Sequence, residues 1–192
     1  MNLPNKITIA RICLIPIFML FLLVDLPLGE VELLNETISV SVLIAAFIFI
    51  IAAGTDWLDG YYARKLNLIT SFGKFIDPLA DKLLVTAALI GLVEVQFIPA
   101  WIAIVIISRE FIVTGIRLVA AAEGDVIAAS NLGKWKTLTQ MIAIIATLLH
   151  NIPFSALSFP FADLMLYVAA ILTIWSGVDY FMKNKHILLK SV

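Results

Sequence analysis

Residues 56–64 read DWLDGYYAR and residues 73–81 read GKFIDPLAD, so that four aspartates stand close together in an otherwise apolar chain. Asp56 and Asp59 are three residues apart and therefore share one face of a helix. Gly73, Asp77 and Asp81 follow one another at intervals of four and line one face of a second helix. Because the connection is short, we expect the two helices to be antiparallel neighbours whose carboxylates converge.

The composition places most of this chain in lipid. Of the 192 residues, 62% are hydrophobic, and the mean hydropathy is +1.05. Soluble domains contain about 45–50% apolar residues, and a domain of this length could not bury such an excess. The length fits a single domain, residues 1–192. The net charge of -1 gives no reason to expect nucleic acid as a partner.

Six apolar stretches approach the length of about 20 residues that a membrane-spanning helix needs. They cover residues 7–24, 38–58, 78–95, 99–122, 138–149 and 162–181, with the fifth extended by Gly133–Thr137. We therefore predict an all-α, polytopic membrane protein with six transmembrane helices. A short segment, Asn2–Thr8, is predicted to lie at the membrane interface before the first helix. No small-residue cleavage site follows that helix, so we interpret it as retained rather than as a signal peptide.

The charges predict the orientation in the membrane. With six spans both termini share one side, and all 13 Lys and Arg residues fall on segments of that side. The opposite connections contain only acidic charges, from Asp25, Glu30, Glu32, Glu36, Glu94 and Asp163. By the positive-inside rule both termini are cytoplasmic, and the protein is a multi-pass protein of the cell membrane. Arg109 fits least well, because it lies about ten residues into its span.

Four carboxylates at the end of a helix pair indicate a metal site. One Asp inside a membrane span costs about 2.5–3.5 kcal/mol on insertion scales, and four together also repel one another. Divalent cations relieve both costs, and oxygen ligands favour Mg²⁺ or Mn²⁺ over zinc. Two ions are expected, as in two-metal phosphoryl chemistry. The alternatives are that the aspartates cap helices and that Gly60, Ala63 and Gly73 serve close helix packing.

The complete pattern D-x2-D-G-x2-A-R-x8-G-x3-D-x3-D, from Asp56 to Asp81, resembles the signature of the CDP-alcohol phosphotransferase family of membrane enzymes. No position departs from that pattern. The resemblance implies a six-helix fold, usually a homodimer, that cleaves a CDP-linked donor and releases CMP. It also implies roles for single residues: Asp56, Asp59, Asp77 and Asp81 as metal ligands, Asp81 as general base, and Asp56, Gly60, Ala63, Arg64 and Gly73 as contacts of the CDP group.

A second group of residues points to an anionic acceptor. Arg109 and Arg117 lie about 80° apart around a helix and about 12 Å apart along it, and Lys134 and Lys136 follow on the same membrane side. Such a cluster suits a phosphate, which Arg can bind with two hydrogen bonds. The alternatives are membrane anchoring by the lysines and a structural ion pair between Arg109 and Glu110.

The flanking segments resemble the bacterial branch of this family that uses glycerol 3-phosphate. They are residues 3–11 (LPNKITIAR), 108–118 (SREFIVTGIRL) and 133–137 (GKWKT). The predicted reaction transfers the phosphatidyl group of CDP-diacylglycerol to glycerol 3-phosphate and gives phosphatidylglycerol phosphate and CMP. Alternatives are another acceptor (inositol phosphate, serine or phosphatidylglycerol), a divalent-cation transporter, and last a metal-stabilised structural bundle.

Overall fold

Helices make up most of the computed structural model, which describes residues 3–34, 36–65, 71–122 and 131–190. Within these ranges the side chains of residues 3–4, 56–65, 71–72, 74–75, 122, 131 and 186–190 lie outside the description. The elements in this part of the chain are α1 (Leu3–Leu23), β1 (Glu30–Leu33), β2 (Glu36–Ser39), α2 (Val40–Lys65), α3 (Ser71–Glu94), α4 (Ala100–Ala122), α5 (Asn131–Leu148), the 3-10 turn η1 (Phe154–Leu157) and α6 (Phe161–Lys190). The six predicted helices are present, and the described residues are mostly helical.

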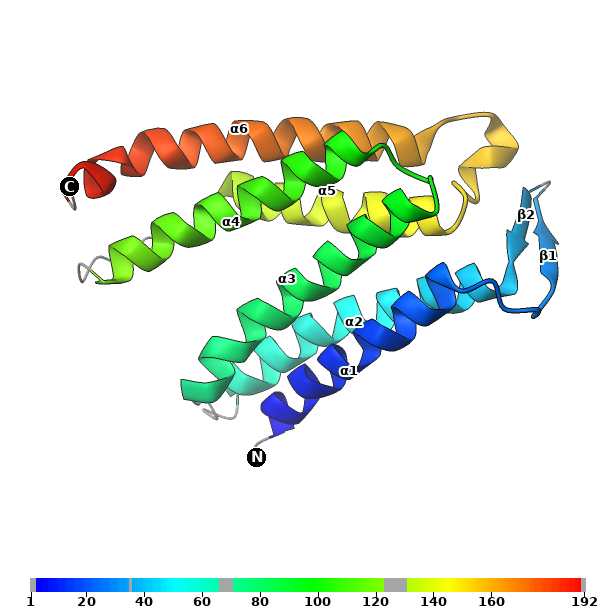
Figure 1. Ribbon diagram of the computed structural model, residues 1–192, viewed down its shortest axis with the longest axis horizontal. Helices are drawn as coiled ribbons and strands as arrows, with labels where there is room; N and C mark the ends of the chain where they lie inside the picture. Colours follow the sequence, from blue (N-terminus) through cyan, green and yellow to red (C-terminus); the bar gives the residue numbers. More distant parts are fainter. Residues whose placement is uncertain (1–2, 35, 66–70, 123–130, 191–192) are drawn as a thin grey trace.

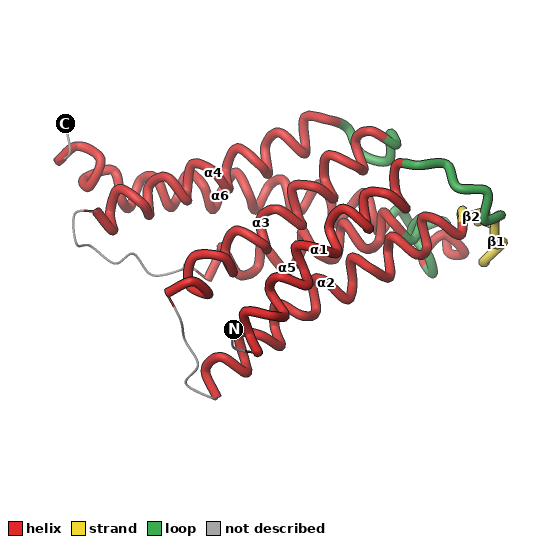
Figure 2. Tube along the Cα trace, turned by 60° about the horizontal axis from the view of Figure 1, so that its bottom comes forward, coloured by secondary structure: helices red, strands yellow, loops and turns green. Residues whose placement is uncertain are grey.

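The six helices alternate in direction and form an elongated bundle (Figure 1). Helix α1 packs along α2 and α3, while α6 packs along α4 and α5. Helix α3 runs obliquely between these two groups and contacts both, as Figures 1 and 2 show. Both termini, the end of α2 and the beginning of α3 therefore lie at one end of the bundle, and the β-hairpin lies at the other.

Apolar side chains fill the centre of the bundle and also cover its outside. Phe18, Phe49, Leu89 and Ile102 are fully buried where α1, α2, α3 and α4 meet. Many large apolar side chains are exposed, among them Phe47, Ile104, Phe111, Leu118, Ile171 and Trp175. Soluble proteins rarely expose apolar surface on this scale. The outer surface therefore fits a lipid environment.

Helix α1 differs from its prediction. The expected interfacial segment, Asn2–Thr8, is not separate, because α1 is continuous from Leu3 to Leu23. Asn5, Thr8 and Arg11 are buried. These polar side chains lie inside the bundle, on a helix that packs on α2 and α3. The first turns of α1 thus belong to the packed protein.

The β-hairpin was not predicted. Strands β1 and β2 pair antiparallel, with Glu30 opposite Ser39 and Leu33 opposite Glu36. Gly29 precedes the hairpin with φ +82°, a conformation that glycine adopts without steric cost, and its carbonyl accepts a hydrogen bond from Val40 N at 3.0 Å. The alternation of Val, Thr and Ile with glutamates is short, and the apolar runs on either side obscured it.

The helices extend beyond the predicted apolar runs at the end that carries the termini. Helix α2 continues through the aspartate segment to Lys65, and α3 begins at Ser71, so that Pro78 lies inside it. By length and composition, two helical segments in the described chain could cross a bilayer, Asn5–Leu23 and Phe161–Lys185, and a shorter apolar segment is Val40–Thr55. Helices α3 and α4 carry several charges in their interiors, among them Asp81 and Lys82 in α3 and Arg109 and Glu110 in α4.

Candidate active site

The aspartate pattern lies on the end of α2 and the beginning of α3. Positions 56 and 59 fall on the last three turns of α2, as the spacing predicted. The side chains of Asp56, Asp59, Gly60, Ala63 and Arg64 lie outside the described residues. Gly73 is buried in the first turn of α3, and Asp77 and Asp81 follow on the same face of that helix. The convergence of all four carboxylates therefore remains a prediction.

Helix α1 contributes a direct contact to Asp77. Thr8 Oγ1 donates a hydrogen bond to Asp77 Oδ1 at 2.6 Å. This length is typical of a hydroxyl that donates to an ionised carboxylate. Asp77 is half-buried, whereas Thr8 is fully buried. Sequence reasoning did not identify Thr8 as part of the site.

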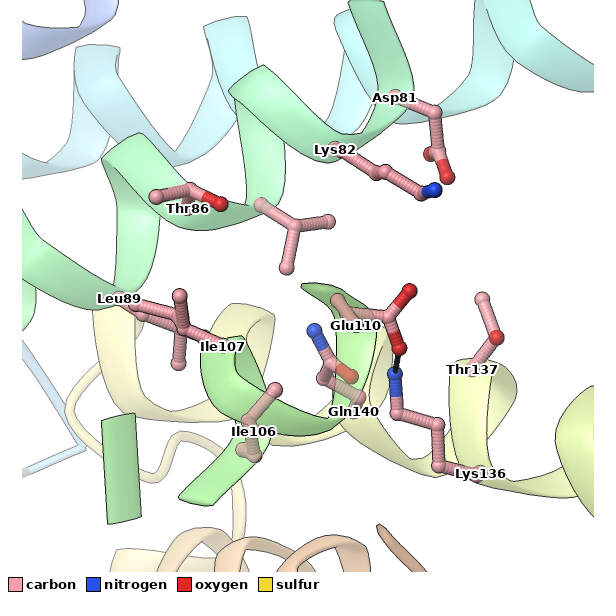
Figure 3. Close-up of a pocket in the computed structure, with 11 residues that line it drawn as sticks. Asp81, Lys82, Thr86, Leu89, Ile106, Ile107, Glu110, Lys136, Thr137 and Gln140 are labelled. Carbon is pink, nitrogen blue, oxygen red and sulfur yellow. Dashed lines mark hydrogen bonds and ion pairs between the residues drawn. The ribbon is translucent and has the colours of Figure 1, made fainter. Parts of the chain in front are cut away.

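Asp81 lies on the walls of two cavities. The larger one has a volume of about 640 Å³ and opens among α3, α4, α5 and α6. The smaller one, about 20 Å³, can hold roughly one water molecule. Both are also bordered by Lys82, Glu110 and Thr137. Figure 3 shows Asp81 and Lys82 on α3 facing Glu110 of α4 and Thr137 of α5 across this space.

Three of the four predicted acceptor residues border the larger cavity. These are Arg109 and Arg117 from α4 and Lys134 from α5. Arg117 Nε donates to Tyr180 Oη at 3.2 Å, and the Arg117 guanidinium carbon lies 5.6 Å from the centre of the Tyr180 ring. Tyr180 of α6 therefore holds Arg117 at the cavity wall, and no sequence pattern indicated this role.

The fourth predicted residue, Lys136, lies beside the smaller cavity and is 2% exposed. Its Nζ donates to Glu110 Oε1 (Figure 3). Arg109 Nη1 donates to the same oxygen at 3.0 Å. One carboxylate thus binds two of the four predicted cations and joins α4 to α5. The structural pair between Arg109 and Glu110, weighed from the sequence as an alternative, is present.

Lys82 is a further cation of the site that sequence reasoning used only for orientation. It borders both cavities next to Asp81, and its Nζ donates to Thr114 Oγ1 of α4. Thr114 Oγ1 in turn donates to the carbonyl oxygen of Glu110 at 2.6 Å. The position of Lys82 directly after Asp81 could have indicated that it belongs to the site, because neighbouring residues on a helix lie about 100° apart and can border the same cavity.

The two predicted metal ligands whose side chains are described, Asp77 and Asp81, have the chemistry that divalent metals require. Among the described side chains, which do not include those of Asp56 and Asp59, there is no group of three or more His, Cys, Asp or Glu residues that could hold a metal ion. Asp77 and Asp81 present oxygen donors one helical turn apart, which suits Mg²⁺ or Mn²⁺. The Thr8 contact uses one lone pair of Asp77 Oδ1 and leaves Oδ2 for a cation. A hydrogen-bonded carboxylate of this kind is usual among metal ligands.

Comparison with known proteins shows to which family the chain belongs. The family described as CDP-alcohol phosphatidyltransferase matches residues 1–175. A CDP-diacylglycerol–glycerol-3-phosphate 3-phosphatidyltransferase of Bacillus subtilis (strain 168) is 63% identical over 183 residues, which cover 95% of each chain. A protein of the same description from Haemophilus influenzae is 42% identical and covers 100% of this chain and 97% of its own.

A relative with a different description also matches. A CMP-forming cardiolipin synthase of rice (Oryza sativa subsp. japonica) is 37% identical over 99% of this chain, which spans 59% of the rice protein. The resemblance drawn from the aspartate pattern is therefore confirmed across most of the length. The chain belongs to the CDP-alcohol phosphatidyltransferase family, a family of membrane enzymes.

Proposed function

We propose that this protein transfers the phosphatidyl group of CDP-diacylglycerol to glycerol 3-phosphate, giving phosphatidylglycerol phosphate and CMP. One observation carries the proposal. The aspartate-bearing helix α3 faces a cavity of about 640 Å³ whose wall includes Arg109, Arg117 and Lys134. The family match and the two bacterial relatives described as using glycerol 3-phosphate support the same reaction.

Two divalent ions, Mg²⁺ or Mn²⁺, would be held by Asp56, Asp59, Asp77 and Asp81. When bound, such ions neutralise the pyrophosphate of the donor and stabilise the charge that develops during phosphoryl transfer. Gly60, Ala63, Arg64, Gly73 and Asp56 are the residues that would contact the CDP group. These assignments rest on the match between this chain and the family pattern.

The acceptor would occupy the larger cavity. Arg117 is held by Tyr180 with its guanidinium at the cavity wall, and Arg109 is fixed by Glu110, so neither side chain has to be ordered when a phosphate binds. Lys134 is exposed at the same wall and adds a third positive charge. Lys136 does not bind the phosphate directly in this proposal, because its ammonium group is bound to Glu110.

Asp81 is placed to act as the general base. It borders the cavity that also contains the cations, so an acceptor bound there by its phosphate would present its hydroxyl near α3. In the proposed step the Asp81 carboxylate takes the hydroxyl proton while the hydroxyl oxygen attacks the phosphorus attached to diacylglycerol. The bond from that phosphorus to the CMP oxygen breaks, and CMP leaves. Positioning and fixed charges supply most of the catalysis of such transfers.

The same proposal includes an orientation and an assembly. Arg11, Lys82 and Arg109 lie near the middle of their helices, and the other ten basic residues lie toward the end of the bundle that carries both termini, which supports a cytoplasmic location of that end. Replacing Lys183 or Glu30 by cysteine, with Cys13 removed, and labelling each from one side of sealed vesicles tests this. A homodimer is expected, and the protein mass measured by light scattering in detergent tests that expectation.

The acceptor is tested with purified protein in detergent, CDP-diacylglycerol and metal. Glycerol 3-phosphate, inositol phosphate, serine and phosphatidylglycerol are supplied one at a time, and CMP and the lipid product are identified by mass spectrometry. We expect CMP and phosphatidylglycerol phosphate to form in equal amounts, with glycerol 3-phosphate alone. Turnover with a different acceptor would overturn the acceptor assignment. A folded protein that releases no CMP with any acceptor would favour the cation transporter.

A further inference from the structure

Helix α1 carries a buried polar stripe, Asn5, Thr8 and Arg11, at the end of the bundle where the aspartates lie. The three residues are spaced by three and share a face of a helix that is otherwise almost entirely apolar. Their exposed fractions are 6%, 0% and 1%. A polar side chain costs free energy when it is buried unless it finds a partner. A helix that served only to anchor the protein would place apolar residues at these three positions.

The stripe lies against both of the helices that carry the aspartates. Thr8 Oγ1 donates to Asp77 Oδ1 of α3 at 2.6 Å. Arg11 Nε donates to Thr55 Oγ1 of α2 at 3.3 Å, and Thr55 Oγ1 donates to the carbonyl oxygen of Ala52 at 2.7 Å. Thr55 directly precedes Asp56. Helix α1 therefore makes side-chain contacts on both sides of the predicted metal site.

The contact with Asp77 restricts the orientation of that carboxylate. A carboxylate can rotate about its terminal bond, and the bond from Thr8 fixes which oxygen faces α1. The second oxygen then faces away from α1. Hydrogen-bond partners that orient metal ligands in this way typically change metal affinity or activity about 10- to 100-fold when they are removed.

We propose that Thr8 is a positioning residue of the metal site: its hydroxyl holds the Asp77 carboxylate in the orientation that binds a divalent cation. The inference rests on the proposed function, because it takes Asp77 as a metal ligand. It assigns to the first turns of α1 a role in metal affinity in addition to packing. Thr8 touches neither substrate nor metal in this account.

The test compares Thr8→Val, Thr8→Ser and the matched control Thr173→Val. Valine keeps the shape of threonine and removes the hydroxyl, and serine keeps the hydroxyl. Thr173 of α6 is also fully buried, but its hydroxyl donates to the carbonyl oxygen of Ala169 in its own helix, at 2.6 Å. Mn²⁺ is titrated into each purified protein without substrate, and free Mn²⁺ is measured by electron paramagnetic resonance.

We expect Thr8→Val to raise the dissociation constant for Mn²⁺ about 10- to 100-fold, with Thr8→Ser and Thr173→Val close to the wild-type protein. The Mn²⁺ concentration for half-maximal CMP release should rise by a similar factor in Thr8→Val, while kcat at saturating Mn²⁺ falls less. The helical circular dichroism signal and the melting temperature in EDTA show whether each variant is folded. Thr8→Ala serves in the same titration if Thr8→Val does not fold.

Equal Mn²⁺ affinity in folded Thr8→Val and Thr173→Val would overturn the proposal. A rise in the dissociation constant in Thr8→Ser as large as in Thr8→Val would also overturn it, because packing and not the hydroxyl would then be responsible. A wild-type protein that binds no Mn²⁺ and releases CMP without metal would instead contradict the proposed function. The two failures are therefore distinguishable in one set of measurements.

Discussion

Asp81 borders both cavities of the site, and its chemistry can be isolated with one substitution. Asparagine has the same shape and keeps a carbonyl oxygen, but it does not accept a proton as a carboxylate does. We expect Asp81→Asn to remain folded and to lower kcat for CMP release by about 10²- to 10⁴-fold, the usual contribution of a general base. Steady-state kinetics at saturating metal measures this.

Asp179→Asn is the control for Asp81→Asn. Asp179 binds Lys183 at 2.8 Å on the surface of α6, where such a pair contributes about 0.3–0.5 kcal/mol to stability. CMP release by Asp179→Asn should equal that of the wild-type protein. If Asp81→Asn kept more than about a tenth of the activity, Asp81 would not be the base.

Arg117 provides a test of the acceptor site. Arg117→Gln removes the charge, and hydrogen bonds to charged groups contribute about 1.5–3 kcal/mol, so KM for glycerol 3-phosphate should rise about 10- to 100-fold. KM for CDP-diacylglycerol should change little. Tyr180→Phe removes only the hydroxyl that accepts from Arg117, and its effect on the same KM should be smaller.

Lys183→Gln is the matched control, because it removes a positive charge from an exposed position at the same end of the bundle. Its two KM values should remain close to those of the wild-type protein. An equal rise of both KM values in Arg117→Gln would contradict a specific role of Arg117 in binding the acceptor.

At the scale of elements, Glu110 joins α4 to α5 through Lys136. Lys136 is buried, and Glu110→Gln would remove the carboxylate that its ammonium group contacts. We expect a loss of about 1–3 kcal/mol in the free energy of unfolding. The double variant Glu110→Gln with Lys136→Met should recover part of this loss, because apolar residues often replace a buried ion pair without cost. Denaturant unfolding in detergent, followed by circular dichroism, measures both.

A double variant that is less stable than Glu110→Gln would show that Lys136 has another partner of comparable strength. Arg109 also binds Glu110, and Asp81 lies close enough to Lys136 for an electrostatic interaction, so full recovery is not expected. The single variant Lys136→Met separates these contributions, because it removes the cation and leaves Glu110 paired with Arg109.

The sequence predicted those elements whose signal is local. Regular spacing identified the faces of α2 and α3 that carry the aspartates, and the apolar runs located all six helices. The contact between Thr8 and Asp77 joins residues 69 positions apart and leaves no periodic signal. The burial of Asn5, Thr8 and Arg11 in a helix continuous from Leu3 to Leu23 was not predicted for the same reason, since it depends on packing that composition does not encode.

In the molecule as a whole, the distribution of charged residues agrees with the alternating direction of the helices. The helices alternate, the termini share one end with most basic residues, and the hairpin at the other end carries Glu30, Glu32 and Glu36 (Figure 1). The predicted family and reaction are confirmed by the comparisons, whereas the site roles stay predictions. The cavity lies among four helices, and sequence spacing within one helix could not give its volume or its walls.

Phosphatidyl transfer by this protein depends on divalent metal in the proposed mechanism, and removing the metal tests that dependence. Purified protein is treated with EDTA, desalted, and supplied with CDP-diacylglycerol and glycerol 3-phosphate, first without metal and then with Mg²⁺ or Mn²⁺. We expect no CMP release above background in EDTA, and recovery of CMP and phosphatidylglycerol phosphate in equal amounts when either ion is restored. CMP release that continues at the same rate in EDTA would contradict a reaction that depends on the four aspartates and their metals.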